Sequence, residues 1–376
     1  MQYRSMKTTN DPLSILGFGC MRFATDSEKN IDQDVALSLL RKAYESGVNY
    51  FDTGWPYHGG KSENLLGEFI QTVPREKIRI ADKLPCWLIK THTDMDFYLE
   101  QQLGKLQTDY IDYYLLHALN KNTWQTLLDN DVFAFIARAK ASGKIRNIGF
   151  SFHDQYPVFE QIVDAYDWDF CQIQLNYIDI EEQAGMKGLH YAAAKGMGII
   201  VMEPVKGGKL AGNIPGEISQ VWDRSSYRIS PAARALKWVW NMPEVTLLLS
   251  GMNTLEQLDE NLALADSTKA GELSDLEMDY YSEVRSLYLQ KMPVQCTGCR
   301  YCMPCPHNVS IPMVFWLYMD AHIFGDLQRH KNEYQMFVSE ENRADKCVQC
   351  GVCVSKCPQS INIPEEMPKV AKYFAD

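Results

Sequence analysis

Eight short apolar runs recur along the first two thirds of the chain, and amphipathic helical patterns fill the gaps between them. The runs cover residues 15–19, 48–53, 78–84, 110–117, 145–151, 170–177, 198–204 and 245–251. Such alternation predicts strands linked by crossover helices, which makes the strands parallel in one sheet. Eight units in roughly 265 residues fit a closed (β/α)8 barrel better than an open sheet.

An open, doubly wound sheet is the alternative, and it normally carries a glycine fingerprint in its first turn. The segment GFGCMR at 17–22 has the first two glycines of that fingerprint and lacks the third. The segment GWPYHGGKS at 54–62 superficially resembles a phosphate-binding loop, but its first glycine is one residue too far from Gly-Lys-Ser. The prediction is therefore the α/β class with a TIM barrel.

The charge balance and the N-terminus restrict the class of protein further. The chain has 37 Lys and Arg against 48 Asp and Glu, a formal charge of −11. This argues against nucleic acid or an anionic membrane as the main partner. The first twelve residues lack the apolar core of a signal peptide, and the apolar stretches are far shorter than the ~20 residues that span a bilayer. We therefore expect a cytoplasmic protein.

Eight of the eleven cysteines lie in two similar runs, CTGCRYCMPCP at 296–306 and CVQCGVCVSKCP at 347–358. In a reducing compartment, disulfides are disfavoured, and structural zinc usually joins two CxxC pairs across a loop. Here three cysteines follow one another at two-residue spacing before the fourth, in both runs. The second run has the spacing of two-cluster ferredoxins, in which the fourth cysteine binds the other cluster. The runs therefore predict two 4Fe–4S clusters.

The tail thus resembles ferredoxin-type domains, and the resemblance implies two interleaved ligand sets. One set is Cys296, Cys299, Cys302 and Cys357, and the other is Cys347, Cys350, Cys353 and Cys305. The first run has two residues before its fourth cysteine where three are usual, and the 41 residues between Cys305 and Cys347 favour a mostly helical variant. We expect a barrel over 1–270, a linker helix over 271–292 and the iron–sulfur domain over 293–376. The scattered Cys20, Cys86 and Cys171 are expected to be buried small hydrophobic residues.

Four polar residues follow successive strand ends of the expected barrel, where such folds place their functional groups. They are Asp52, Tyr57, Lys83 and His117. An ammonium next to a tyrosine favours the phenolate and lowers its pKa, and a carboxylate keeps that ammonium charged. Alone, each residue is more often a cap, a packing group or a hydrogen-bonded side chain. Together on one rim, they indicate a proton donor for reducing a carbonyl.

These motifs resemble the aldo-keto reductase family over residues 13 to about 265. The segments that carry the resemblance are NYFDTGWPYHGGKSENLLGE, IADKLP and YIDYYLLHAL. The resemblance implies that Tyr57 is the general acid, that Lys83 and Asp52 tune it, and that His117 orients the carbonyl. It also implies a nicotinamide cofactor, NADP(H) or NAD(H), bound at the barrel rim.

By the same resemblance, Ser151 and Gln172 hold the carboxamide, and Met202 stands where many members stack an aromatic ring. Gly251 and Gln257 occupy positions where many members have the lysine and arginine that bind the 2′-phosphate, so the sequence favours neither cofactor. Arg22, Lys206 and Lys209 are alternative cations. The expected cofactor contacts are Met21, Asp52, Ser151, Gln172, Met202, Gly251, Gln257 and Asn261.

The sequence therefore predicts an oxidoreductase that reduces an aldehyde or ketone, with an apolar pocket at Trp55, Trp87, Phe152, Tyr177 and loop 211–229. Hydride transfer moves two electrons together, whereas the clusters move one at a time. The clusters are thus expected to serve electron transfer, sensing or structure, with a ferredoxin-type protein as an electron partner. The alternative hypothesis is a nicotinamide-binding electron-transfer or redox-sensing protein that does little carbonyl reduction.

Overall fold

The computed structural model describes residues 1–6, 8–26, 28, 30–212, 214–325 and 327–375, and its chain divides into two compact units. The first unit consists of Met1–Pro204 and Ala233–Glu272, and the second of Val205–Ala232 and Leu273–Asp376. Within the described ranges, we find no helix whose length and hydropathy would let it traverse a bilayer.

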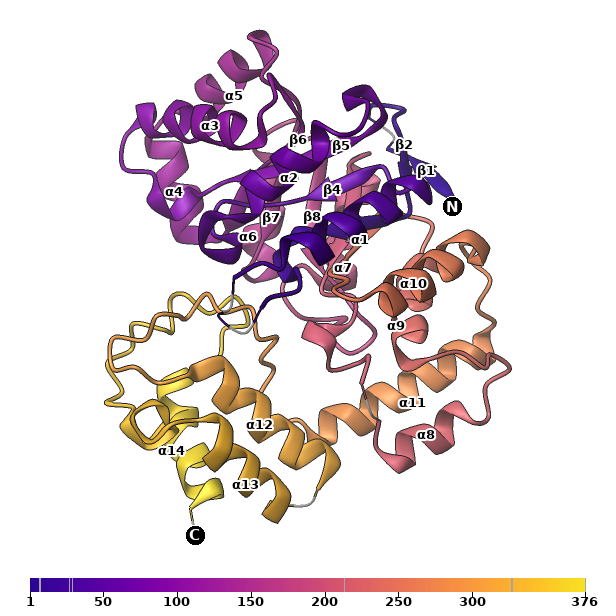
Figure 1. The fold of residues 1–376 in the computed structure, drawn as a ribbon, viewed down its shortest axis with the longest axis vertical. Helices are drawn as coiled ribbons and strands as arrows, with labels where there is room; N and C mark the ends of the chain where they lie inside the picture. The colour runs from indigo at the N-terminus through magenta and orange to yellow at the C-terminus, as the bar shows by residue number, and fades with distance from the viewer. Residues whose placement is uncertain (7, 27, 29, 213, 326, 376) are drawn as a thin grey trace. The chain divides into compact units, whose positions relative to one another are not determined.

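In the described part of the first unit, eight parallel strands close into a barrel, which confirms the predicted fold class (Figure 1). Neighbours follow chain order from β3 to β9, and β10 closes the ring between β9 and β3. The strands are β3 (Leu16–Gly19), β4 (Tyr50–Asp52), β5 (Arg79–Leu84), β6 (Ile111–Leu119), β7 (Ile145–Phe152), β8 (Phe170–Gln174), β9 (Gly198–Met202) and β10 (Val245–Ser250).

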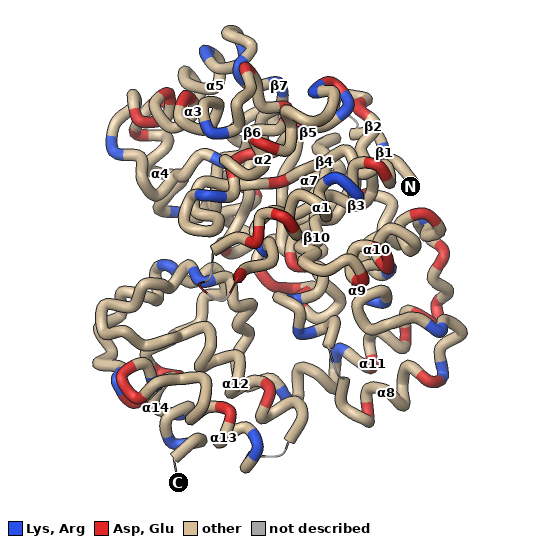
Figure 2. The backbone as a smooth tube through the Cα atoms, in the orientation of Figure 1, with Lys and Arg blue, Asp and Glu red and all other residues tan. Residues whose placement is uncertain are grey.

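Helices surround the barrel, as the amphipathic patterns predict (Figure 1). In α1, Asp32 caps the N-terminus by accepting from the backbone of Val35, and Leu39 and Leu40 are buried on one face. Acidic and basic residues are interspersed along the helices of this unit (Figure 2). The helices are α1 (Gln33–Glu45), α2 (Ser62–Ile70), α3 (His92–Leu106), α4 (Lys121–Asp129), α5 (Val132–Ala141), α6 (Tyr156–Asp164), α7 (Gly185–Ala194), α9 (Pro231–Trp240), which begins in the second unit, and α10 (Leu255–Ser267).

A short antiparallel hairpin, β1 (Tyr3–Ser5) and β2 (Pro12–Ser14), precedes the barrel and supplies part of its core. Met6 and Leu13 are fully buried in a cluster with inward-facing strand residues such as Tyr113. Gly198 leaves space for Met6, because a Cβ there would lie 2.6 Å from the buried Met6 side chain and would displace it. The barrel interior is therefore a packed core.

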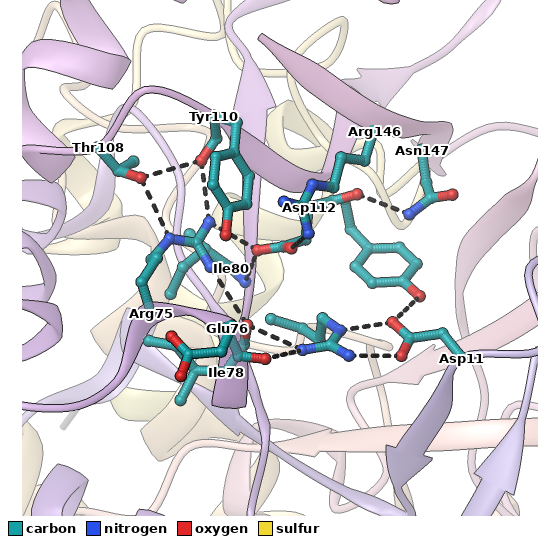
Figure 3. A network of polar contacts seen from close by, with 12 residues as sticks. Asp11, Arg75, Glu76, Ile78, Ile80, Thr108, Tyr110, Asp112, Arg146 and Asn147 are labelled. Carbon is teal, nitrogen blue, oxygen red and sulfur yellow. Dashed lines mark hydrogen bonds and ion pairs between the residues drawn. The ribbon is translucent and has the colours of Figure 1, made fainter. Parts of the chain in front are cut away.

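A polar network fixes the N-terminal ends of several strands (Figure 3). The buried carboxylate of Asp112 lies 2.7 Å from Nη2 of Arg75 and 3.3 Å from Nη1 of Arg146. It also accepts a hydrogen bond from the backbone N–H of Ile80 at 3.0 Å. Because these groups come from separate strands and loops, one carboxylate fixes the relative positions of β5, β6 and β7 on the side opposite the strand ends that carry the predicted site.

The second unit is helical in its described part, with α8 (Gly216–Trp222), α11 (Asp275–Lys291), α12 (Ile311–Phe324), α13 (Leu327–Phe337) and α14 (Ile363–Phe374). Helix α11 lies within the range expected for the linker helix, 271–292. The segment between Cys305 and Cys347, expected to be mostly helical, contains α12 and α13, and Gly325 ends α12 with a positive φ of 71°. Tyr334 of α13 stacks on Phe374 of α14 with ring centroids 4.4 Å apart.

Replacing Asp112 with Ala should destabilise the barrel by about 2–3 kcal/mol, because the buried Ile80 N–H and two guanidinium groups lose their acceptor. The matched control is Asp96→Ala, which removes an exposed ion pair with Arg138 and should cost about 0–1 kcal/mol. Urea unfolding followed by tryptophan fluorescence measures both. Equal losses would show that the network does not hold the strands.

Candidate active site and cysteine sites

A buried ion pair between Lys83 and Asp52 lies at the C-terminal ends of β4 and β5. Lys83 Nζ is 2.6 Å from Asp52 Oδ1 and donates to the carbonyl of Thr53 at 2.5 Å. The Lys83 side chain is fully buried and that of Asp52 is 4% exposed. Since a buried ammonium is costly without a counter-charge, the carboxylate fixes both the position and the charge of Lys83.

Tyr57 and His117 complete the group of four. Tyr57 begins the short 3-10 helix η2 (Tyr57–Gly60), and its hydroxyl oxygen accepts a hydrogen bond from Lys83 Nζ at 3.2 Å. The Tyr57 ring lies edge-on to the His117 imidazole, with centroids 5.9 Å apart. Both side chains are buried. The structure thus brings together the four residues that the sequence places at successive strand ends.

Gln102 of α3 supports this group through the backbone of Lys83, and no motif in the sequence indicated it. Its amide nitrogen donates to the Lys83 carbonyl at 2.9 Å and to the Glu63 carboxylate at 3.1 Å. Its amide oxygen accepts from the Tyr114 hydroxyl at 2.7 Å. Since Gln102 is fully buried, these bonds hold the backbone of Lys83 in place.

Burial dominates the protonation of the site. It raises the pKa of Tyr57 well above its ordinary value, and the charge of Asp52 raises it further. Burial also lowers the pKa of His117 well below its usual range, with Lys83 adding to the effect. The expectation that Lys83 gives Tyr57 a lowered pKa is therefore wrong, because loss of water disfavours the phenolate more. Tyr57 is protonated and His117 is neutral near pH 7.

Gly54 keeps the space between the Tyr57 and His117 rings open, and we did not predict a role for it. A Cβ at this position would lie 3.2 Å from Tyr57 Cζ and 3.3 Å from His117 Cε1. Both contacts are tighter than most contacts that a real Cβ makes. A side chain here would press on both rings.

Three of the expected nicotinamide contacts lie on neighbouring strands, Ser151 on β7, Gln172 on β8 and Met202 on β9. The Gln172 amide nitrogen contacts Met202 Sδ at 3.5 Å, and its buried Oε1 has no hydrogen-bond partner among the described residues. Ser151 Oγ accepts from the backbone of Ala118 at 2.8 Å, which leaves its proton to donate. A carboxamide, which both donates and accepts, fits these groups.

Most of the remaining expected contacts already make hydrogen bonds or ion pairs within the barrel unit. Asn261 donates to the Ser250 hydroxyl at 3.1 Å, and Gln257 Oε1 accepts from the Asn253 backbone at 2.9 Å. Met21 is half-buried in the 3-10 helix η1 (Cys20–Arg22). Asp52, although it pairs with Lys83, keeps Oδ2 buried without a partner in the described part of the chain.

Arg22 lies against Gly251, at the position where many family members have the phosphate-binding lysine. A Cβ on Gly251 would lie 3.0 Å from Arg22 Cβ and 3.3 Å from its Cδ. The guanidinium lies 3.5 Å from Glu203 Oε1, and its side chain is 37% exposed. From the sequence we proposed Arg22 only as one of three alternative cations. Its contact with Gly251 could not be predicted, because the two residues are more than 200 positions apart in the chain.

The expected aromatic pocket is only partly open. Trp87 is 41% exposed, and its ring lies 5.1 Å from the His117 ring. Trp55 packs edge-on against Tyr98 with centroids 4.9 Å apart. Phe152 and Tyr177 are buried in the barrel unit. The loop 211–229 belongs to the second unit, and residue 213 lies outside the described residues.

The eight tail cysteines fall into two neighbourhoods. Burial raises the pKa of Cys302 to about 12, and three nearby thiols add to it: Cys299, Cys296 and Cys357. Burial also raises the pKa of Cys353, and the added charges come from Cys347, Cys305 and Cys350. Cys353 and these three neighbours also line one cavity, together with Pro306 and Ile363. The ferredoxin resemblance implies the same two groups of four as ligand sets, and their role as ligands stays a prediction.

Each neighbourhood supplies four thiols, the donor set of a 4Fe–4S cluster. Among the described residues, no three His, Cys, Asp or Glu side chains converge as the ligands of one metal ion do. Cys20, Cys86 and Cys171 are buried in the barrel unit, as expected.

The first unit is thus a closed (β/α)8 barrel with Asp52, Tyr57, Lys83 and His117 buried at one rim. The aldo/keto reductase family model matches residues 15–285, well over half of the chain, and the 4Fe-4S dicluster domain model matches residues 295–361. The chain therefore belongs to the aldo/keto reductase family and carries a 4Fe–4S dicluster domain at its C-terminal end.

Named relatives match the barrel region. L-galactose dehydrogenase of Arabidopsis thaliana is 26% identical over 76% of this chain and 94% of its own length. NADH-specific methylglyoxal reductase of Escherichia coli is 24% identical over 71% of this chain and 97% of its own length. Among solved structures, an aldo-keto reductase of Bacillus halodurans in holo form superposes with a TM-score of 0.64 at 22% identity, covering 76% and 96% of the two chains. One from Klebsiella pneumoniae in complex with NADPH gives 0.63 at 20% identity, covering 76% and 95%.

Replacing Gly54 with Ala should lower kcat/KM for carbonyl reduction by about 100-fold, because the added methyl displaces Tyr57 or His117. Nicotinamide affinity, measured by fluorescence titration, should change less than about twofold, since the methyl points between those rings. The matched control is Gly104→Ala on α3, where an added Cβ meets nothing within 4 Å. Full activity of the Gly54 variant would contradict this account of the space.

Proposed function

We propose that this protein reduces an aldehyde or ketone to the alcohol with a reduced nicotinamide, and that Tyr57 donates the proton. One observation carries the proposal: the buried Lys83 ammonium contacts the Asp52 carboxylate at 2.6 Å and the Tyr57 hydroxyl at 3.2 Å. A fixed positive charge beside a buried phenol has its largest effect when that phenol gives up its proton.

When bound, the reduced nicotinamide supplies a hydride for the carbonyl carbon. Tyr57 donates its proton to the carbonyl oxygen, so the C=O bond becomes an H–C–O–H alcohol. Lys83 stabilises the tyrosinate that remains, and Asp52 keeps Lys83 charged. Neutral His117 positions the carbonyl oxygen near Tyr57, and the partly exposed Trp87 offers apolar surface for the rest of a small substrate.

A barrel that binds a nicotinamide and carries the cysteine tail also supports a second candidate function. In this alternative, the protein transfers electrons or senses redox state and reduces carbonyls little. Cys350 is exposed, and its neighbour Val348 is 59% exposed, so a ferredoxin-type partner has access to this cysteine set. We favour the reductase, because electron transfer alone gives no reason to bury Lys83 beside Tyr57. In either case we propose a reducing, cytoplasmic setting for the eight thiols.

Replacing Tyr57 with Phe should reduce carbonyl reduction by about 10²–10⁴-fold, because the proton donor is lost while the ring remains. NADPH binding should be unchanged. The comparison variant is Cys350→Ser, assayed anaerobically with a carbonyl panel and with a one-electron acceptor. It should lower electron transfer to the acceptor and spare carbonyl reduction.

Unchanged carbonyl reduction in the Tyr57→Phe protein would sink the proposed mechanism. If the unmodified protein reduces no carbonyl of the panel, while electron transfer requires Cys350, the second candidate is the better function.

We further propose that Arg22 contacts the cofactor's phosphates and favours NADPH. The relatives divide on this point, since the E. coli enzyme is named NADH-specific and the K. pneumoniae structure contains NADPH. Arg22 supports NADPH because the aliphatic part of its side chain packs against Gly251, where the usual lysine is missing. Its contact with Glu203, at 3.5 Å, is long enough to be exchanged for a phosphate.

Replacing Arg22 with Ala should weaken NADPH binding by about tenfold or more and NADH binding by less than about threefold, as loss of a charge-assisted hydrogen bond predicts. Isothermal titration measures both affinities, with Arg22→Lys as the variant that keeps the charge. An equal loss for the two nicotinamides would place Arg22 at the pyrophosphate and overturn its role in selection.

A further inference from the structure

His58, the residue after Tyr57, has an unusual backbone conformation. Within η2, its φ is 51° and its ψ is 42°, a left-handed geometry that residues with a Cβ rarely adopt. Gly59, which follows, adopts a similar geometry at little cost. Strain of this kind persists only where the surroundings hold it, and it is frequent at functional sites. The His58 side chain is thus held in a direction that an ordinary turn would not give it.

The His58 imidazole contacts the backbone on both sides of Arg22. Its Nε2 accepts a hydrogen bond from the backbone N–H of Phe23 at 3.1 Å, and the ring also hydrogen-bonds to the backbone of Met21. The Phe23 ring packs against the imidazole with centroids 5.6 Å apart, and Phe23 is buried. One side chain from η2 therefore fixes the residues before and after Arg22.

The start of η1 is fixed separately, from α2. The Ser62 hydroxyl donates to the Cys20 carbonyl at 3.1 Å and lies 2.9 Å from the Thr53 hydroxyl, and all three residues are buried. In contrast, the Arg22 guanidinium has a 3.5 Å ion pair with Glu203 and is partly exposed. Arg22 thus combines a fixed backbone with a side chain whose ion pair is long enough to be exchanged for another anion.

We propose that His58 is a positioning residue, which holds the backbone of Arg22 so that the guanidinium meets a phosphate of the nicotinamide cofactor. Because His58 directly follows Tyr57, the same imidazole links this phosphate contact to the proton donor. The inference rests on the proposed function, in particular on the role of Arg22, but it does not depend on which carbonyl is reduced. Loss of the imidazole should leave the Phe23 N–H without its acceptor and let the Arg22 turn move.

The hydrogen bond from Phe23 requires a neutral imidazole. Burial lowers the pKa of His58, and its hydrogen bond to the Met21 backbone opposes that shift. Near pH 7 the neutral ring therefore carries its proton on Nδ1 and accepts at Nε2. Protonation in acid turns Nε2 into a donor and breaks the bond. The hold on Arg22 is thus present at neutral pH and is lost as the pH falls through the pKa of His58.

Other ionisable groups lie on the elements packed against the imidazole. On η1, η2 and the first turn of α2, these groups are Cys20, Arg22, Tyr57, Lys61 and Glu63. Burial raises the pKa of Cys20 and of Tyr57, which keeps both neutral. Lys61 donates to Asn30 at 2.9 Å, and Glu63 pairs with Lys105 at 2.6 Å. A substitution at His58 itself separates its titration from theirs.

The test compares His58→Leu with His58→Gln in the full-length protein. Gln retains an acceptor at the place of Nε2, whereas Leu has none, and both place a side chain on the same strained backbone. Isothermal titration with NADP⁺ should show about tenfold weaker binding for the Leu variant and a change below about threefold for the Gln variant. Hydrogen exchange of residues 20–24 should be faster only in the Leu variant. The matched control, His190→Leu, removes a 57% exposed imidazole of α7 and should leave NADP⁺ affinity unchanged.

Two further measurements show whether His58 acts through Arg22. Adding His58→Leu to the Arg22→Ala protein should cost less than about threefold in NADP⁺ affinity, because the phosphate contact is already lost. Between about pH 8 and about pH 5, the native protein should lose more NADP⁺ affinity than His58→Gln, whose profile retains any titration of the cofactor. Equal affinities of the native and Leu proteins, or additive losses in the double variant, would overturn the inference. Tyr57→Phe tests the carbonyl chemistry separately, so either proposal can fail alone.

Discussion

The buried ion pair between Lys83 and Asp52 is the interaction on which the barrel site depends. Parallel pairing of β4 with β5 places Asp52 opposite Ala81, two residues before Lys83, and the packed core prevents water from replacing either partner of the ion pair. Tyr57 then has a cation at its hydroxyl, and Gln102 holds the backbone that carries that cation. Without the carboxylate, Lys83 would be an uncompensated buried charge. This would destabilise the local fold and move the ammonium away from the Tyr57 hydroxyl.

The proposed function assigns different numbers of electrons to the two units. In the barrel, a bound nicotinamide and the buried Tyr57 would move a hydride and a proton together, which suits a two-electron reduction. The eight thiols form two neighbourhoods with unequal exposure, since Cys302 is buried whereas Cys350 is exposed. Such a pair suits single electrons that enter at one cluster and rest at the other.

Much of this architecture could be predicted from the sequence, because it follows from local periodicity. Strand ends located Asp52, Tyr57, Lys83 and His117 on one rim, and cysteine spacing indicated the clusters. The features that could not be predicted depend on distances across the rim. Gly54 matters because two rings flank it, and Arg22 matters because it packs on Gly251. The predicted direction of the Tyr57 pKa shift was wrong. Burial dominates this shift, and the burial of a side chain cannot be read from residue types.

The central claim is that the barrel delivers hydride and proton together, without using the tail's electrons. The most direct test is an anaerobic single turnover with nicotinamide carrying deuterium at the transferred position and a carbonyl substrate. Mass spectrometry follows the label while visible absorption follows the clusters. The account predicts one deuterium on the carbinol carbon and no change in the cluster absorption. Solvent hydrogen at that carbon, with clusters reduced as the nicotinamide is oxidised, would contradict it.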